Sequence, residues 1–460
     1  MKLKSYYLIT FVIIIFLTSS VLSTFFYFKE KKENIYCRDC NIILISIDTL
    51  RADHLGIYGY ERNTTPNIDN FFRDAFVFSN AFSQAPNTLP SHMSIFTGLY
   101  PSNHKLLLLH ENETLSNQHK TIAEILKLYG YRTFGFYTGD YLSPRYGFSR
   151  GFDEYSAYDF FDNKSKLFDL LELAKGKNEK FFLFLHNDYV HDPYLAYHPY
   201  DTAFDSNYSG RIIGNIEDFY NSPQIKNLDN HSEIRSFYWS FVNKSDQRDI
   251  NHLIALYDGS INMVDSFFGN FFNYLDHLNL LNNTIVILTA DHGEEFGEHG
   301  GFLHEKLYDE TIHIPLLVYI PNSKTNSETN AITDQVRSID ILPTLLSVVG
   351  IEAPQGIDGR SLKFLMKNPA ATDNDQTLFT EFSFERAVRT PEWKLIKTMN
   401  GSVIYEFFNL KNDSGEKINL HGKGLEKETE FRNLLESWEI KMNSSYVNVE
   451  FLNSTFIGYP

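Results

Sequence analysis

Short apolar runs recur along the chain, and several of them end directly in residues with reactive side chains. The run Asn41–Ile47 (NIILISI) ends in Asp48, and the run Thr284–Ala290 (TIVILTA) ends in Asp291 and His292. Both runs are short, rich in β-branched residues and without alternation, which is typical of strands buried on both faces of a mostly parallel sheet. Ligands of open α/β sheets bind outside the carboxyl ends of the strands, so these polar residues predict a functional site there.

Helical patterns and further strands follow along the chain. Helices are predicted over residues 68–74, 90–97, 121–129, 250–280 and 339–349, and further strands over 131–138, 180–186 and 314–320. Residues 197–247 lack periodicity and are expected to form a long insertion. From about residue 375 the pattern changes to short strands and turns. We therefore predict an α/β domain with a large, mostly parallel sheet over residues 41–374, and a smaller C-terminal α+β subdomain over residues 375–460.

The first thirty residues form a separate segment. No charged side chain occurs between Tyr6 and Phe28, and lysines flank this stretch on both sides. A stretch of this length is enough to span a bilayer, which predicts a basic flank at residues 1–5 and a transmembrane signal anchor at residues 6–28. A cleaved signal peptide is the alternative, because Val21-Leu22-Ser23 offers small residues at a suitable spacing. The catalytic body is expected outside the cytoplasm, periplasmic or extracellular, and is secreted if the segment is cleaved.

Composition narrows the classes of partner. Aromatic residues make up 15% of the chain, which indicates a packed globular body, and the net charge of −17 counts against nucleic-acid binding. The two cysteines, Cys37 and Cys40, precede a strand rather than a helix, which does not fit a redox motif. Two thiolates alone do not make a structural zinc site. In an oxidising compartment they are expected to form a local disulfide.

The segment that follows the run Thr284–Ala290 is dense in potential ligands. Three histidines, four acidic residues and four glycines fall within the fourteen residues 291–304. A solvated acidic loop with incidental histidines is the alternative, but this density favours a metal site.

We predict a single divalent metal ion, bound by Asp48, Thr88, Asp291 and His292. Two carboxylates, a hydroxyl oxygen and an imidazole suit Zn²⁺ or Mn²⁺. Thr88 precedes the predicted helix 90–97, whose free backbone N–H groups favour a bound anion. Metal coordination lowers the pKa of a hydroxyl, so Thr88 is the predicted nucleophile.

Several segments, in this order, resemble the sulfatases of the alkaline phosphatase superfamily. The similarity covers nearly everything after residue 40, and it is carried by Asn41–Asp48, Thr88–Ser91, Asp291–Gly293, Gly297–Gly300, Ser338–Leu346, Asp358–Leu362, Arg389–Ile396 and Tyr405–Leu420. This resemblance implies an alkaline phosphatase-like fold, with a large mixed, mostly parallel central sheet flanked by helices and a smaller C-terminal sheet. It also implies one divalent metal beneath the scissile ester, which in sulfatases is commonly Ca²⁺.

The chain departs from the sulfatase pattern at two places. Sulfatases carry CxPSR, whose cysteine becomes formylglycine, whereas this chain has Thr88-Leu89-Pro90-Ser91-His92. They also carry GKWH after the strand equivalent to residues 131–138, where this chain has Gly139-Asp140-Tyr141-Leu142. Threonine at the nucleophile position instead resembles the superfamily's phosphodiesterases and membrane phosphoethanolamine transferases.

Further residues are predicted to act on the substrate. Histidine has a pKa suited to protonating a leaving group, so we predict catalytic roles for His191 and His304. The segment His191-Asp192-Pro193-Tyr194 is similar to the one that holds the substrate histidine of sulfatases. His92, His299 and Lys306 are predicted to bind substrate, although histidines at helix starts or between glycines also hydrogen-bond loops, and an isolated lysine is more often a solvated surface charge.

The sequence thus predicts a metal-dependent hydrolase of sulfate or phosphate esters, in which Thr88 forms a covalent threonine ester. The expected partner is an anionic ester, namely a sulfated or phosphorylated glycan, lipid or small molecule, with the membrane as a second partner through the N-terminal segment. Two alternatives stay open. They are a membrane-anchored phosphoethanolamine-type phosphoryl transferase, and a degenerate member that binds an anionic glycan or lipid without turnover.

Overall fold

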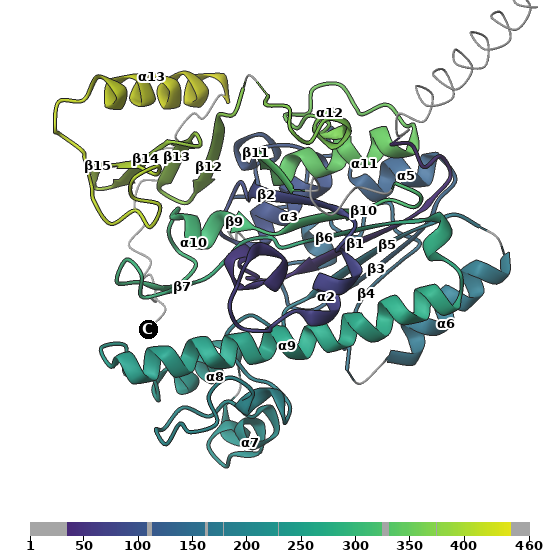
Figure 1. The fold of residues 1–460 in the computed structure, drawn as a ribbon, viewed down its shortest axis with the longest axis horizontal. Helices are drawn as coiled ribbons and strands as arrows, with labels where there is room; N and C mark the ends of the chain where they lie inside the picture. The colour runs from purple at the N-terminus through teal and green to yellow at the C-terminus, as the bar shows by residue number, and fades with distance from the viewer. Residues whose placement is uncertain are drawn as a thin grey trace, which may run out of the picture.

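The structure is a computed structural model of the chain. It describes residues 35–107, 113–161, 164–177, 179–228, 230–323, 331–373 and 375–442. Figure 1 shows a large α/β body with a smaller sheet beside it at one end.

A nine-stranded sheet forms the centre of the large body. Its strand order is β11-β2-β10-β6-β1-β5-β3-β4, with β9 paired to β2. The central strand β1 (Asn41–Ile47) is parallel to both of its neighbours, β5 (Phe181–Asn187) and β6 (Thr284–Thr289). The mixed character comes from β10, which is antiparallel to β6 and β2. The remaining strands are β2 (Phe76–Phe82), β3 (Arg132–Tyr137), β4 (Glu154–Ala157), β9 (His313–Ile314), β10 (Leu316–Tyr319) and β11 (Ala331–Arg337).

Helices cover both faces of this sheet. In Figure 1, α2, α6 and the long α9 lie on one side, and α3, α5 and α11 lie on the other. Every residue of β1, β5 and β6 is buried, as expected for strands between two helical layers. The helices are α2 (Pro66–Phe71), α3 (Thr88–Thr97), α4 (Pro101–His104), α5 (Ile122–Leu128), α6 (Lys164–Lys177), α7 (Ile216–Asn221), α8 (His231–Trp239), α9 (Gln247–His277), α10 (Asp309–Ile312), α11 (Ile341–Val349), α12 (Lys363–Lys367) and α13 (Glu426–Lys441).

A four-stranded antiparallel sheet follows near the C-terminus. It consists of β12 (Leu378–Phe382), β13 (Glu385–Arg389), β14 (Trp393–Asn400) and β15 (Ser402–Asn409), with α13 against it (Figure 1). Buried residues of α13 pack with β13 to β15 in their own apolar cluster. A short hairpin, β7 (Glu295–Phe296) and β8 (Phe302–Leu303), lies in sequence between strands β6 and β9 of the central sheet. The predicted fold, a mixed central sheet flanked by helices with a smaller C-terminal sheet, is confirmed.

The sequence missed several elements whose patterns are irregular. Strand β2 (FVFSNAF) carries two polar residues, and β11 (AITDQVR) contains a bulge, so neither shows clean periodicity. The predicted insertion at 197–247 contains the short helices α7 and α8. The two cysteines form a disulfide, Cys37–Cys40.

The predicted transmembrane signal anchor is corrected by the structure. Within the described ranges, no helix combines the length and the apolar character needed to cross a membrane. The longest of the described helices, α9, buries one apolar face in the protein instead. Residues 6–28, on which the prediction depended, lie outside the described residues.

One buried histidine makes the stability of this fold sensitive to acid. His104, at the end of α4, is 1% exposed; its Nδ1 accepts the Leu106 N–H at 3.1 Å, and its Nε2–H donates to the Pro90 carbonyl at 3.2 Å. Burial lowers the pKa of His104 to about 3.

We expect the free energy of unfolding to fall as the pH drops from about 6.5 towards 3, because only the unfolded chain then protonates His104. The slope from this residue is roughly 1.4 kcal/mol per pH unit. Urea titrations across this pH range measure it. The variant His104→Gln should show a shallower slope than wild type, whereas His277→Gln, which changes an exposed histidine at the end of α9, should not.

Candidate active site

Three adjacent parallel strands carry the candidate site at their carboxyl ends. Ser46 of β1 is in register with His186 of β5 on one side and with Thr289 of β6 on the other. Asp48 therefore leaves β1 beside the polar residues that follow β5 and β6. Because parallel neighbours end at the same edge of a sheet, side chains distant in sequence meet there.

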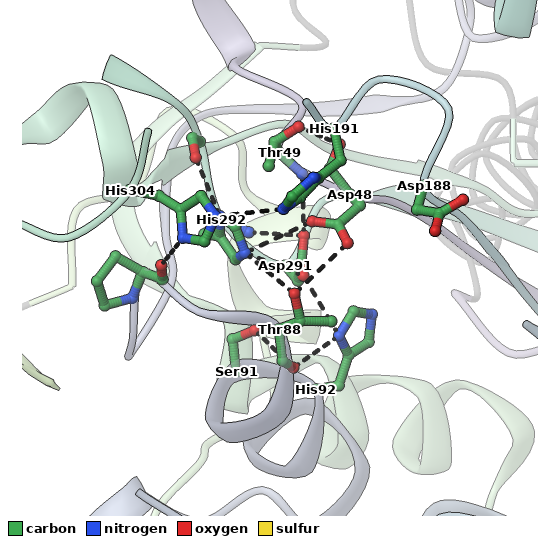
Figure 2. Close-up of polar contacts among 12 residues, drawn as sticks. Asp48, Thr49, Thr88, Ser91, His92, Asp188, His191, Asp291, His292 and His304 are labelled. Carbon is green, nitrogen blue, oxygen red and sulfur yellow. Dashed lines mark hydrogen bonds and ion pairs between the residues drawn. The ribbon is translucent and has the colours of Figure 1, made fainter. Parts of the chain in front are cut away.

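Asp48, Asp291 and His292 form the buried core of this site. One ligand atom of each lies within 4.8 Å of those of the other two, and all three residues are buried. Figure 2 shows the carboxylates and the imidazole converging on Thr88. The structure thus brings together the four residues that the sequence predicted as metal ligands.

Local hydrogen bonds aim the lone pairs of these residues into a common space. Oδ1 of Asp291 accepts the backbone N–H groups of Thr49 (3.2 Å) and His292 (3.0 Å). Nδ1 of His292 lies 3.0 Å from the Gly293 carbonyl, so it carries the proton and Nε2 presents its lone pair. Oδ2 of Asp291 and Oδ1 of Asp48 are buried and accept no hydrogen bond from the described residues. Each lies within 3.5 Å of Nε2 of His292.

This donor set fits a divalent metal ion. Burial and the neighbouring Asp48 carboxylate hold the pKa of Asp291 well above its usual range. A divalent cation between two such carboxylates reverses their repulsion, and buried charges without a hydrogen-bond donor are otherwise costly. Carboxylate oxygens with an imidazole nitrogen suit zinc or manganese better than calcium. Ligand chemistry alone therefore ranks the metals without selecting one.

Thr88 presents its hydroxyl to this cluster from the start of α3. Its Oγ1 lies 3.4 Å from Oδ2 of Asp48 and 3.4 Å from Nε2 of His292. The helix begins at Thr88 itself, two residues earlier than predicted, with Asn87 as the N-cap residue. The hydroxyl therefore lies in the first helical turn, where backbone N–H groups without intrahelical partners favour an anion.

The backbone beside the site is held in unusual conformations. Thr49 and Leu303, which are next to Asp48 and His304, have φ values of 56° and 74°. β-branched residues rarely adopt this region, so the surrounding contacts must hold Thr49 there. The buried Tyr257 of α9 does so, since its hydroxyl donates to the Thr49 carbonyl at 2.7 Å and accepts the Arg51 N–H at 2.9 Å. Helix α9 thus fixes the turn that carries Asp48.

A pair of histidines faces the cluster from two other loops. Nδ1 of His191 donates to the Asp192 carbonyl at 2.8 Å, and Nδ1 of His304 donates to the Pro86 carbonyl at 2.9 Å. Their Nε2 atoms lie 3.3 Å apart. One proton bound to either Nε2 can therefore form a hydrogen bond to the other. Burial, with His292 and His191 nearby, lowers the pKa of His304 well below its usual range. The structure therefore brings the two predicted catalytic histidines together (Figure 2).

The three predicted substrate-binding residues make their contacts with protein atoms. His92 is fully buried below Thr88, with Nδ1 2.9 Å from the Thr88 carbonyl and Nε2 2.9 Å from Oγ of Ser46. Nδ1 thus bonds within α3, and Nε2 joins α3 to β1. His299 lies 3.2 Å from the carbonyls of Gly415 and Glu416, and Lys306 forms a 2.7 Å ion pair with Glu385. Substrate binding by these three residues stays a prediction, and their polar groups also contact other segments of the protein.

The structure also adds His186, which the sequence analysis did not select. Nδ1 of His186 lies 3.1 Å from the Thr138 carbonyl, and its buried Nε2 faces Oδ2 of Asp48 at 3.5 Å. It also belongs to a second potential metal-binding group, with His92 and Asp291. Its position at the end of an apolar run was the available signal, but only the pairing of β5 with β1 places it beside Asp48.

A cavity of about 510 Å³ lies over Thr88, and its wall contains both acidic and basic side chains. Its size is typical of small-molecule sites. The loop that follows β3 contributes Gly139, Asp140 and Tyr141 to the wall. Residues of the insertion, which carried no readable motif, complete it, namely Tyr220, His231, Ile234 and Arg235.

Comparison with known proteins identifies the family. The family described as Sulfatase matches residues 40–351, and the one described as N-sulphoglucosamine sulphohydrolase, C-terminal matches residues 297–442. Arylsulfatase K of Mus musculus is 25% identical over 449 residues, covering 88% of this chain and 79% of that protein. The ulvan-active sulfatase of Formosa agariphila is 27% identical over 440 residues, with coverages of 88% and 80%.

Solved structures agree with this fold. A protein in complex with its substrate D-glucosamine-2-N,6-O-disulfate superposes with a TM-score of 0.73 at 20% identity, covering 88% of this chain and 99% of that one. The phosphonate monoester hydrolase of Silicibacter pomeroyi gives a TM-score of 0.70 at 21% identity, covering 87% and 95%. The Sulfatase match spans more than half of the chain. It includes the strands β1, β5 and β6 and the loops after them, which carry the site. This protein therefore belongs to the sulfatase family of ester hydrolases.

Proposed function

We propose that this protein hydrolyses sulfate esters with Thr88 as the nucleophile, in place of the formylglycine that the sulfatase resemblance leads one to expect. The position of Oγ1 of Thr88, 3.4 Å from both Asp48 and His292 at the start of α3, is the observation that carries the proposal. The same position in a buried metal-binding cluster is where a hydroxyl is most readily activated. Membership of the sulfatase family favours sulfate over phosphate as the group transferred.

Asp48, Asp291 and His292, with Thr88, would hold one divalent ion, for which we favour Zn²⁺ or Mn²⁺. When bound, such an ion lowers the pKa of the Thr88 hydroxyl and offsets charge on the ester oxygens. The amino-terminal end of α3 then attracts the anionic ester towards Thr88. Burial of the cluster excludes water, which strengthens each of these electrostatic interactions.

The histidine pair supplies the proton that the leaving group needs and later takes one from water. The Thr88 oxygen, having lost its proton to water, forms a bond to sulfur as the bond from sulfur to the leaving oxygen breaks. The leaving oxygen takes the proton held at Nε2 of the His191 and His304 pair and departs as an alcohol. The neutral pair then takes a proton from a water molecule, whose oxygen bonds to sulfur and releases Thr88.

A substrate panel with purified protein tests the proposal. We expect turnover of aryl and alkyl sulfates in preference to the corresponding phosphate mono- and diesters, with a divalent ion bound in a one-to-one ratio by elemental analysis. A clear preference for a phosphate ester contradicts the choice of sulfate. A protein that binds sulfated glycans without a stoichiometric metal and without turnover contradicts catalysis altogether.

Two further aspects of the function follow as proposals. The substrate is an anionic ester of a glycan, lipid or small molecule, since the cavity over Thr88 has room for more than the ester group. The catalytic body works outside the cytoplasm, which the Cys37–Cys40 disulfide supports because such bonds persist in oxidising compartments.

A further inference from the structure

Helix α8, in the insertion, is bound to the loop that carries His191. The buried carboxylate of Asp192 accepts two bonds from Arg235, from Nε to Oδ2 at 3.0 Å and from Nη2 to Oδ1 at 2.6 Å. Oδ2 also accepts the Trp239 indole N–H at 2.8 Å. Arg235 and Trp239 are four residues apart on α8 and so lie on the same face of the helix. One carboxylate thus receives three donors from one helix.

Asp192 is in turn the residue that orients His191. Its carbonyl lies 2.8 Å from Nδ1 of His191, and its Oδ1 lies 3.2 Å from the same nitrogen. Both contacts favour the tautomer with a proton on Nδ1, which directs Nε2 towards His304 and the ester. Burial by itself raises the pKa of Asp192, but His191, Arg235 and Trp239 together lower it below its usual value. The carboxylate therefore stays charged and holds the imidazole.

The same helix face reaches the second histidine loop. The ring of Trp239 lies 5.7 Å from that of Phe302, edge to face, and Phe302 is two residues before His304. Arg235 also lines the cavity over Thr88. Helix α8 therefore contacts both loops that present the histidine pair.

We propose that Arg235 and Trp239 are positioning residues for His191, acting through Asp192. The insertion thereby sets the orientation of the imidazole that protonates the leaving group. This inference rests on the proposed ester hydrolysis. It predicts a selective effect, because the proton matters most when the bond from sulfur to a poor leaving group breaks.

Leaving-group dependence is the test of this selectivity. Lysine at position 235 keeps the charge but loses the bidentate geometry, and phenylalanine at 239 keeps the ring but loses its N–H donor. We expect Arg235→Lys and Trp239→Phe to lower kcat for an alkyl sulfate by about tenfold or more, with KM little changed. For 4-nitrophenyl sulfate, whose leaving group needs little protonation, we expect a loss of less than about threefold. In a His191→Ala background, Arg235→Lys should add no further selective loss.

A matched control comes from the neighbouring pair Arg248 and Asp205. Arg248 makes the same two-pronged contact with Asp205, at 2.5 and 2.8 Å, on an exposed surface. Arg248→Lys should leave kcat and KM for both substrates unchanged. Equal losses for aryl and alkyl sulfates, or an effect of Arg235→Lys that persists in the His191→Ala background, would overturn the proposal.

A second measurement does not need a substrate. The ¹⁵N chemical shifts of the His191 imidazole report which nitrogen carries the proton, and in wild type we expect Nδ1 to be protonated. In Arg235→Lys and Trp239→Phe, we expect a mixture of tautomers, with His277 as an unchanged reference. If no ester is hydrolysed but the tautomer shifts, the proposed function fails and the positioning role stands. An unchanged tautomer in both variants contradicts the positioning role.

Discussion

Replacement of Thr88 by alanine is expected to lower kcat/KM for a sulfate ester by at least about 10³-fold, because it removes the attacking oxygen and leaves the rest of the site in place. The methyl of alanine fits where the larger threonine side chain was, and Thr88 contributes no side-chain hydrogen bond shorter than 3.4 Å to the fold. Folding should therefore be preserved, and the two carboxylates and the imidazole of Asp48, Asp291 and His292 remain to hold the metal ion, although its affinity should fall with the loss of the Thr88 oxygen. Initial rates with wild type and variant, together with metal analysis of both, measure the effect.

Two companion variants separate chemistry from structure. Thr88→Ser keeps the hydroxyl, so we expect it to retain activity within about tenfold of wild type. Thr97→Ala removes a hydroxyl at the other end of α3, where Oγ1 donates to the Met93 carbonyl at 2.6 Å, and should leave the rate unchanged. If Thr88→Ala and Thr97→Ala were equally active, Thr88 could not be the nucleophile. Trapping a sulfated Thr88 peptide by mass spectrometry would support the covalent step directly.

The second large effect is expected from Asp291→Asn. Oδ1 of Asp291 is held by two backbone N–H groups and its free Oδ2 points at the cluster, so the amide keeps the shape but removes a charged ligand. We expect loss of the stoichiometric metal and a fall in kcat/KM of about 10³-fold or more. Exhaustive treatment of wild type with a chelator should have the same effect, and addition of the metal should reverse it only in wild type.

Thermal unfolding gives a readout of the same site that does not depend on activity. A ligand that binds only the folded state stabilises it by about 2.7 kcal/mol at a concentration one hundred times its Kd. We therefore expect added Zn²⁺ or Mn²⁺ to raise the Tm of metal-free wild type, but not that of Asp291→Asn. Asp265→Asn is the matched control, because Asp265 is also buried and also accepts two backbone N–H groups, from Asn67 and Ile68. A metal-dependent Tm in Asp291→Asn would exclude Asp291 as a ligand.

The three predicted substrate-binding residues share one feature that the sequence could not show. His92, His299 and Lys306 have side chains suited to binding an anion, and sequence proximity to the motifs suggested that they do. In the folded chain, their polar groups also contact distant segments of the protein. The partners are Ser46 for His92, the Gly415 and Glu416 carbonyls for His299, and Glu385 for Lys306. Residue type indicates what a side chain can bind, but only its neighbours decide what it does bind.

The insertion contributes to the site although its sequence did not predict any contribution. Residues 197–247 have no clean periodicity because their helices are short and their polar surface is large. Yet α8 supplies three hydrogen bonds to Asp192 and part of the cavity wall over Thr88. A local sequence pattern does not predict a contact between residues more than forty positions apart. The insertion's role in the site became visible only in three dimensions.

By itself, the sequence determined the central strands of the large sheet and the place of the candidate site at their carboxyl ends. Runs such as Asn41–Ile47 and Thr284–Thr289 are too short and too apolar for any place except a buried parallel strand, and a charged residue directly after such a strand must lie at its carboxyl edge. Asp48, Asp291 and His292 could therefore be named in advance. Tertiary structure alone decided which ring nitrogen of His304 faces His191, because the tautomer of His304 follows from a hydrogen bond to the carbonyl of Pro86, far away in the sequence.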